Sequence, residues 1–255
     1  MPSVSLILPV YNEVNLIHNA VEHCVKSLSE SFSDFEIILV DDGSSDGSGS
    51  VLQELANNYP HVKILFNYVN LNVGVCVQRA MAVAQKDFVV HNGIDLPLAP
   101  KDIIHLIPHM ENCDVLVLER DAYPGYTLWR FICSKINRVL IRLLFQQSIR
   151  DLNFTQMYRR EIISKIRPVA KSPAFTTPEM ILRAVCQGLR VKTIAWPYQK
   201  RPSGKGAFGR PHDILWNLYD MARYSMFLRK KNRSLTELPE MPVNQKIGPE
   251  ISSIS

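Results

Sequence analysis

Short apolar runs alternate with helical apolar patterns over the first half of this chain. Apolar residues recur at helical spacing and predict three helices, at about 14–28, 51–56 and 75–84. Asn12 stands where it would cap the first of them. Buried strands are predicted at Val4–Leu8, Glu36–Val40, Val62–Phe66, Phe88–Val90 and Val115–Leu118. This alternation favours right-handed βαβ crossovers, and therefore an α/β fold with a mainly parallel sheet.

Three polar segments follow strands of this predicted sheet. They are Pro9–Glu13, Asp41–Asp46 and His91–Pro97. Ligands of open parallel sheets bind outside the carboxyl ends of the strands. We therefore expect these three segments to form one site at one edge of the sheet.

The second half of the chain has a different pattern. Between Ala122 and Arg150 there are five basic residues and no acidic one, and apolar residues form a wide band. This pattern predicts a basic amphipathic helix near 127–147, suited to a membrane surface, although a core helix with solvated basic residues is the alternative. We expect one domain over 1–212, a C-terminal amphipathic helix over 213–231 and a flexible tail over 232–255.

Composition narrows the class of protein without identifying a ligand. The 255 residues are 46% hydrophobic and 21% charged, as in globular domains, and the net charge is +5. The five cysteines are scattered and never form C-x-x-C, which favours a reducing compartment. We find no signal peptide pattern and no apolar stretch long enough to span a bilayer. We expect a cytoplasmic protein at the membrane periphery, and no nucleic-acid binding, because no aromatic platform accompanies the basic residues.

Aromatic and acidic residues at the first two strand ends suit a nucleoside. A base can stack beside Tyr11, while Asp41 and Asp42 can accept hydrogen bonds from ribose hydroxyls or a base N–H. Gly43 permits the tight turn. Neither a Walker loop nor a dinucleotide fingerprint follows the first strand. The alternative is that Asp41–Asp46 only turns the chain.

SLILPVYNEVNLI followed by EIILVDDGSSDGS resembles the family 2 glycosyltransferases, which are inverting enzymes of the GT-A fold. Within that family the chain looks most like the dolichyl- or polyprenyl-phosphate sugar synthases, over about Val4–Phe208. The resemblance implies a nucleotide-sugar donor and a lipid-phosphate acceptor. It also implies that the nucleotide is held by Pro9, Tyr11, Asn12, Glu13, Asp41 and Asp42.

The family's Asp-x-Asp motif, which holds Mg²⁺ or Mn²⁺ against the diphosphate, aligns with Gly93-Ile94-Asp95. Gly93 stands where the first acid is expected, and Asp95 matches the second. The resemblance therefore implies a metal or diphosphate contact at Asp95 with half of the clamp missing. The alternative for Asp95 is a helix-capping role.

Further candidates follow from the same resemblance. Asp151 and Glu179 are candidate catalytic carboxylates, beside Asp95, and Glu179 alternatively stabilises a helix N-terminus. Arg120, Arg201 and Lys205 are expected to bind the acceptor phosphate or the diphosphate, although 200–206 can also be read as a solvated basic loop.

Three functions remain open from the sequence. A lipid phosphate is already an anion at neutral pH, so a transferase acting on it needs no strong general base. A family 2 enzyme acting on a sugar hydroxyl would need one, such as Glu179. The third is a nucleotide-binding paralogue with weakened catalysis, which Gly93 and Pro97 suggest. The sequence does not choose between GDP and UDP or identify the sugar, and it leaves the oligomeric state open.

Overall fold

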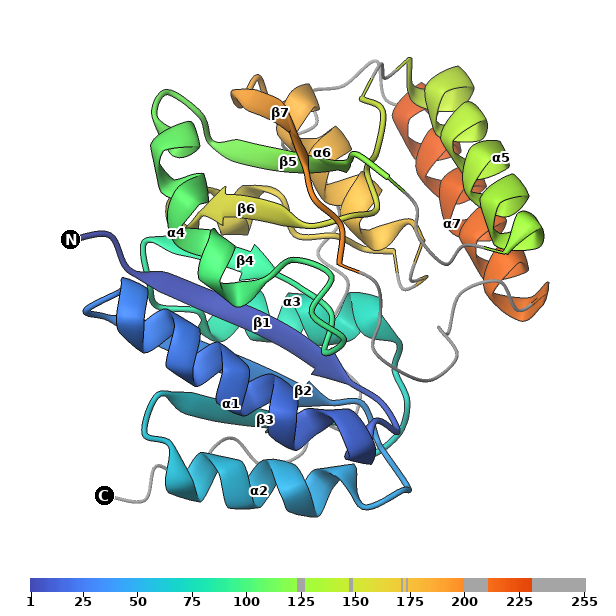
Figure 1. Ribbon diagram of the computed structural model, residues 1–255. Coiled ribbons are helices and arrows are strands. Elements are labelled where there is room, and N and C mark those ends of the chain that lie inside the picture. The colour runs from blue at the N-terminus through green and yellow to red at the C-terminus, as the bar shows by residue number, and fades with distance from the viewer. Residues whose placement is uncertain (123–126, 147–148, 171, 173, 200–210, 231–255) are drawn as a thin grey trace.

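The computed structural model describes residues 1–122, 127–146, 149–170, 172, 174–199 and 211–230. Its centre is a seven-stranded sheet in the order β3-β2-β1-β4-β6-β5-β7 (Figure 1). Only β6 runs antiparallel to its neighbours, so the sheet is mainly parallel. The strands are β1 (Val4–Val10), β2 (Phe35–Asp41), β3 (Val62–Phe66), β4 (Phe88–His91), β5 (Val115–Arg120), β6 (Gln156–Arg159) and β7 (Val191–Trp196).

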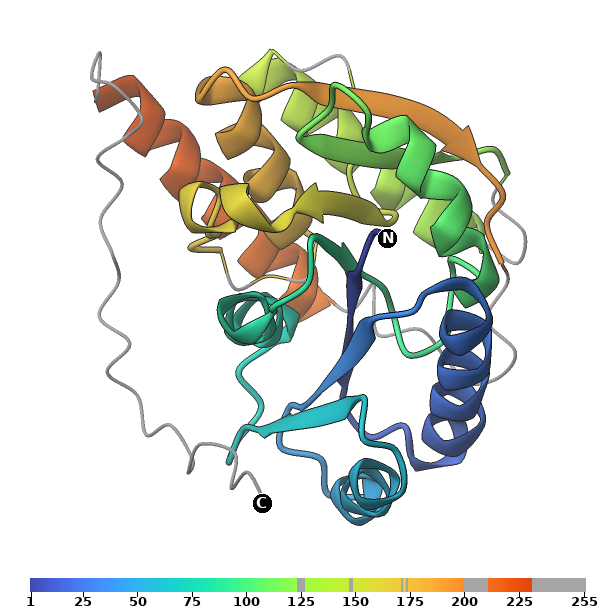
Figure 2. The same cartoon turned by 90° about the vertical axis from the view of Figure 1, so that its left-hand side faces the viewer.

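Helices cover both faces of the sheet (Figure 2). Helices α1 (Val14–Ser31), α2 (Ser48–Asn58) and α4 (Ile103–Leu106) contribute to the core on one face. Helices α3 (Val73–Val83), α6 (Thr176–Cys186) and α7 (Pro211–Lys230) contribute to the core on the other face. Short 3₁₀ helices are η1 (Pro100–Asp102), η2 (Ile107–Met110) and η3 (Arg160–Lys165).

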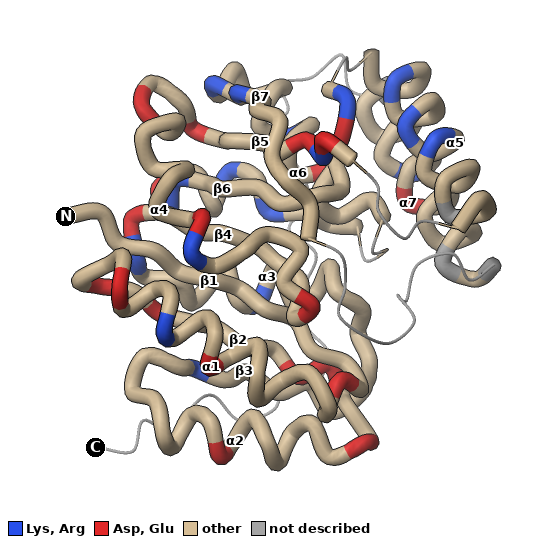
Figure 3. Tube along the Cα trace, viewed as in Figure 1, with Lys and Arg blue, Asp and Glu red and all other residues tan. Residues whose placement is uncertain are grey.

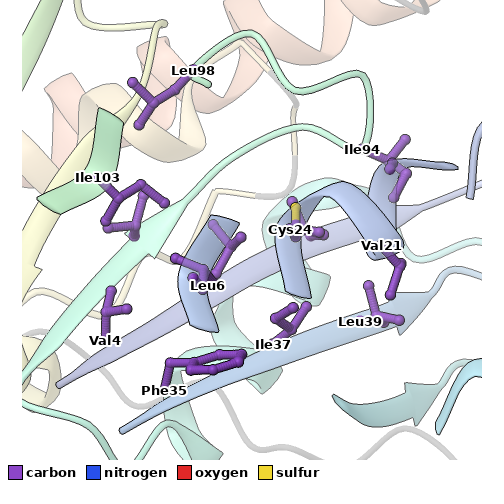
Figure 4. Close-up of a cluster of buried hydrophobic side chains, with 14 of the residues drawn as sticks. Val4, Leu6, Val21, Cys24, Phe35, Ile37, Leu39, Ile94, Leu98 and Ile103 are labelled. Atoms are coloured by element: carbon purple, nitrogen blue, oxygen red, sulfur yellow. The ribbon is translucent and has the colours of Figure 1, made fainter. Parts of the chain in front are cut away.

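Alternation along the strands explains the two cores. In β1, Leu6 and Leu8 point toward α1, whereas Ile7 points toward α3, and all three are fully buried. Figure 4 shows Leu6 beside Ile37 of β2 and Cys24 of α1. Burying apolar side chains on both faces stabilises the sheet from both sides, which is why its parallel strands read as continuous apolar runs.

The predicted α/β class and the five predicted strands are confirmed, with boundaries shifted by no more than two residues. The predicted cap is wrong. Helix α1 begins at Val14 after Glu13, with no side-chain cap, while Asn12 adopts a left-handed backbone conformation with φ of 53°. Its side chain instead accepts a hydrogen bond from the Ser45 N–H, at 2.8 Å. Asn12 therefore joins two loops rather than closing a helix end.

The predicted basic helix is α5 (Leu128–Phe145), and it packs against α7. The pair lies outside the sheet, toward the side where β1 and β5 end (Figure 1). Among the described residues, no helix combines the length and apolar character needed to cross a bilayer. The predicted tail over 232–255 lies outside the described residues, so its flexibility stays a prediction.

Candidate functional site

Unequal strand lengths create a recess at the carboxyl edge of the sheet. Strand β4 ends at His91, which pairs with Ile7, whereas β1 continues to Val10. Strand β6 begins at Gln156, opposite Val117, whereas β5 continues to Arg120. The two short central strands are thus flanked by two longer ones.

A cavity of about 190 Å³ occupies this recess. Its wall includes three kinds of predicted residue: Pro9 from the nucleotide group, Asp95 from the metal motif and Arg120 from the phosphate group. The sheet order places them in sequence across the edge, with β1 first, then β4 and β6, then β5. The remaining lining residues are Val73, Val77, His91, Asn92, Gly93, Pro97, Asn153, Phe154, Thr155, Thr176, Thr177 and Tyr198.

Hydrogen bonds join the loops that follow β1 and β2. The Asn12 N–H donates to Ser44 Oγ at 3.0 Å, and the Glu13 N–H donates to Ser48 Oγ at 3.1 Å. The Val14 N–H donates to the Asp46 carboxylate at 3.0 Å. These bonds hold Tyr11, whose side chain is 46% exposed, beside the end of β2. The predicted aromatic group at this edge is therefore accessible to a ligand.

The carboxylates of Asp41 and Asp42 leave β2 toward opposite faces of the sheet. Asp41 Oδ1 accepts from the Ser44 N–H, on the side of α2. Asp42 Oδ1 accepts from Asn67 Nδ2 at 2.7 Å and from the Leu71 N–H at 2.8 Å, on the side of α3. Burial raises the pKa of the Asp42 carboxyl in spite of these hydrogen bonds. Asp42 thus secures the segment after β3, and its contact with a nucleoside stays a prediction.

Arg120 and Asp151 form one unit at the end of β5, where Arg120 lines the cavity. Arg120 Nε donates to Asp151 Oδ2 at 2.6 Å and Nη2 donates to Oδ1 at 2.9 Å, a two-bond fork. The Arg120 guanidinium also lies 5.8 Å from the ring centre of Phe154 and 5.6 Å from that of Tyr198. A carboxylate and two rings therefore fix the orientation of the guanidinium.

In the predicted metal motif, Gly93-Ile94-Asp95, little space remains beside Gly93, where the family's first acid was expected. A Cβ atom built on Gly93 would lie 2.3 Å from Asp95 Oδ1, so the Asp95 carboxylate occupies the space beside Gly93. Among the described residues, no group of three His, Cys, Asp or Glu side chains converges as a metal site. The Asp95 carboxylate alone can hold a divalent ion only if water and the diphosphate oxygens of a bound nucleotide complete the coordination.

Glu179 lies in α6, and its carboxylate is bonded to the protein itself. Oε2 accepts from the Val169 and Ala170 N–H groups at 2.9 and 2.6 Å. Oε1 accepts from Arg183, and the ion pair is almost completely buried. The cavity at the strand ends is lined by Thr176 and Thr177 of this helix, not by Glu179.

Sequence reasoning did not find every residue that lines the cavity. It missed the aromatic side chains Phe154 and Tyr198, and it named His91 only as the start of a loop. No spacing rule connects these residues with Arg120, because they meet through the sheet. The predicted phosphate-binding residues Arg201 and Lys205 lie outside the described residues.

Comparison with known proteins identifies the family and the fold. The family model described as "Glycosyl transferase family 2" matches residues 5–167. The undecaprenyl-phosphate 4-deoxy-4-formamido-L-arabinose transferase of Proteus mirabilis is 31% identical over 162 residues, covering 63% of this chain and 50% of that protein. The chain thus spans about half the length of this curated relative.

Solved structures share the fold at low identity. Glucosyl-3-phosphoglycerate synthase from Mycobacterium tuberculosis, solved with Mn²⁺, UDP and glucosyl-3-phosphoglycerate, has a TM-score of 0.62 at 17% identity, covering 89% of this chain and 80% of that one. The mannosyltransferase PcManGT from Pyrobaculum calidifontis, solved with GDP-mannose and Mn²⁺, has a TM-score of 0.62 at 15% identity, covering 91% and 66%. The match of the family model over most of the chain, together with this shared GT-A architecture, shows that the chain belongs to glycosyltransferase family 2.

Proposed function

We propose that this protein transfers a sugar from a nucleotide-sugar to a lipid-linked phosphate of the polyprenyl type, with inversion at the anomeric carbon. One observation carries the proposal. A single cavity has Pro9 and Asp95 on the side of the nucleotide loops and the fixed guanidinium of Arg120 on the other. The Proteus mirabilis relative, named as an undecaprenyl-phosphate sugar transferase, supports the acceptor class.

The donor nucleotide would lie along the ends of β1 and β2. Tyr11 offers an exposed ring for the base, and the joined loops after the two strands offer polar groups for the ribose. The diphosphate would then reach Asp95. A divalent ion, held there by Asp95 and the diphosphate itself, would neutralise negative charge on the departing nucleoside diphosphate.

The acceptor phosphate would bind at Arg120. A phosphate oxygen forms the new bond to the anomeric carbon while the bond from that carbon to the diphosphate breaks, and the nucleoside diphosphate leaves with the electron pair. The phosphate is already ionised, so positioning and charge stabilisation are sufficient. This agrees with the bonding of the two remaining carboxylates. Asp151 pairs with Arg120 and Glu179 with Arg183, so neither is placed as a general base.

We further propose that α5 and α7 rest on the membrane that contains the acceptor. Leu128, Ile132, Ile136, Val139 and Leu143 form one helical stripe, and each side chain is 40% or more exposed. Helix α7 adds Leu215, Trp216, Leu218, Tyr219 and Met226, all exposed. Helix α5 itself contains basic residues and no acidic ones (Figure 3). An apolar stripe flanked by positive charge suits an anionic bilayer surface.

Vesicle flotation tests the membrane contact. We expect the protein to float with vesicles of phosphatidylcholine and phosphatidylglycerol, and the double substitution Ile136→Glu with Leu143→Glu to abolish flotation. Val69→Glu is the matched control, because Val69 is 62% exposed but lies after β3. Equal flotation of all three proteins would refute this contact.

A transfer assay tests the function. Purified protein is incubated in detergent with undecaprenyl phosphate, Mn²⁺ and UDP- or GDP-sugars, and the lipid product is measured. We expect product with at least one donor, and a loss of about a hundredfold for Arg120→Lys, which keeps the charge but loses the fork. Nucleotide binding without transfer to any acceptor would favour the weakened paralogue. Transfer to a sugar hydroxyl alone would favour the second class of acceptor.

A further inference from the structure

Two buried polar atoms belong to residues that are neighbours in the sheet, and one of these residues, His91, lines the cavity. His91 of β4 and Gln156 of β6 are paired in register. Val89 and Tyr158, two residues along each strand, both belong to the core beneath α3 and α6. His91 and Gln156 therefore point to that same face, as directly opposed residues of an antiparallel pair do. His91 Nδ1 and Gln156 Oε1 have no hydrogen-bond partner among the residues that the structure describes.

The orientation of the Gln156 amide is fixed by its other end. Nε2 donates to the carbonyl oxygens of Leu152 and Phe154, at 3.1 and 3.4 Å. The oxygen Oε1 is thus the unsatisfied atom, and Gln156 is completely buried. A buried polar atom without a partner costs stability, so a group from outside the chain that supplies hydrogen bonds here would be bound favourably.

The chemistry of the pair selects the kind of group. A carboxamide oxygen only accepts hydrogen bonds, so an ionised phosphate or carboxylate cannot satisfy it. Burial lowers the pKa of His91 to about 4, so its imidazole is neutral near pH 7 and has one N–H and one acceptor nitrogen. A hydroxyl group donates and accepts at once, and therefore satisfies both atoms.

The position of the pair in the sheet identifies the source of the hydroxyl. Strands β4 and β6 lie between β1, where Pro9 faces the cavity, and β5, which ends at Arg120. Neighbouring strands are about 4.8 Å apart, so the nucleotide side and the phosphate side are about 14 Å apart. On the proposed function, the group between the diphosphate and the acceptor phosphate is the transferred sugar. A polyprenyl phosphate has no alcohol hydroxyl to offer there.

We propose that His91, with Gln156 behind it in the sheet, forms a hydroxyl-binding subsite for the transferred sugar and determines which donor sugar is accepted. The cavity volume of about 190 Å³ greatly exceeds the roughly 15 Å³ that one bound water requires, so a larger group has room beside His91, which lines the cavity, while Gln156 lies behind the lining. The inference rests on the proposed function, because it needs a nucleotide-sugar at this edge.

Calorimetric binding of paired ligands tests the subsite. Dissociation constants are measured for UDP and UDP-glucose, and for GDP and GDP-mannose, with the wild type, His91→Phe and Gln156→Met. For the accepted donor we expect each substitution to weaken nucleotide-sugar binding about tenfold. Binding of the free diphosphate should stay within about twofold. His61→Phe is the matched control, since His61 lies exposed at the far end of β3 and packs on Phe35.

Deoxy analogues of the accepted donor give a second measurement that needs no variant. Removing the bound hydroxyl should weaken binding to the wild type by about the same factor, and the analogue should bind the wild type and His91→Phe equally. An equal effect of His91→Phe on the diphosphate and the nucleotide-sugar, or no effect on either, would overturn the subsite alone. A wild type that binds none of the four ligands would overturn the proposed function and the subsite together.

Discussion

Two guanidinium–carboxylate forks lie at the two ends of β5 and differ mainly in burial. Asp151 pairs with Arg120 at the carboxyl end, where the side chains are 3% and 7% exposed. Asp114 pairs with Arg190 at the other end, where they are 12% and 58% exposed. In both forks Nε and Nη2 of the arginine donate to the two carboxylate oxygens. Comparing them isolates the effect of the environment.

We expect Asp151→Asn to lower the free energy of unfolding by about 3 kcal/mol. Removing one partner of a buried ion pair costs about 3–5 kcal/mol, because the remaining charge is left uncompensated. The lower end applies because asparagine retains one acceptor oxygen for the guanidinium. This corresponds to roughly a hundredfold in the folding equilibrium, at about 1.4 kcal/mol for each factor of ten.

Asp114→Asn is the matched control, and its effect should be much smaller. Arg190 remains solvated after the substitution, and water and salt screen an exposed pair. Urea unfolding of the three proteins at one ionic strength measures both effects. The transfer assay adds a readout that stability alone would not change. Asp151→Asn should raise the KM for the lipid phosphate, because Arg120 loses its orientation, while Asp114→Asn should not. Equal destabilisation by the two substitutions, or an unchanged KM for Asp151→Asn, would refute this reasoning.

Two further predictions concern the metal motif and a buried acid. Gly93→Asp brings a second carboxylate against Asp95, whose Oδ1 would lie 2.3 Å from the new Cβ. In a thermal-shift experiment we therefore expect this variant to melt at a lower temperature than the wild type without metal, and to show a larger rise in melting temperature on adding Mn²⁺. The control Gly93→Asn should show no such Mn²⁺ response, and equal responses of the two variants would argue against a metal at Asp95. Burial raises the pKa of Glu36, but hydrogen bonds from Lys63, Ser5 and Gln85 outweigh this effect, so the pKa lies below its usual value. The ionised Glu36 therefore stabilises the fold fully above about pH 4.5, and this contribution is lost as the pH falls through the folded-state pKa. Between about pH 7 and about pH 3, the free energy of unfolding should fall less steeply for Glu36→Gln than for the wild type, and identical slopes would contradict the assignment.

The sequence was sufficient for the first five strands of the described sheet, β1 to β5, and for the edge at which they end. Buried parallel strands such as β2 appear as continuous apolar runs, and the polar residues that follow them must lie outside the core. Strand β6 could not be predicted in the same way. Its four residues, Gln156–Arg159, have no apolar run, and they form a strand because β4 and β5 supply hydrogen-bond partners on both sides. A pairing set by tertiary contacts leaves no local signal.

The arginine partner of Asp151 could not be predicted from the sequence, because this pairing also depends on tertiary contacts. Arg120 and Asp151 are separated by 31 positions, and they meet because Arg120 ends β5 while Asp151 lies in the segment before β6, the strand that pairs with β5. The resemblance to family 2 made Asp151 and Glu179 candidate catalytic carboxylates, with structural roles as the alternatives. In our proposal neither carboxylate is catalytic, because each is paired with an arginine. Asp151 orients a binding group, and Glu179 fastens α6 to the segment at Val169 and Ala170.

Residues at the strand ends line the cavity, whereas the fold depends on the residues buried within the sheet. Leu6, Ile37 and their neighbours fix the sheet from within, so the strand ends can vary without loss of the fold. Gly93 and His91 both lie at the end of β4, and both face the cavity. One removes a carboxylate from the diphosphate side, and the other adds a neutral polar group beneath the proposed sugar position. If both inferences hold, this protein relies less on a metal clamp and more on direct recognition of the sugar. Its dependence on Mn²⁺ should then be weak and its choice of donor sugar narrow.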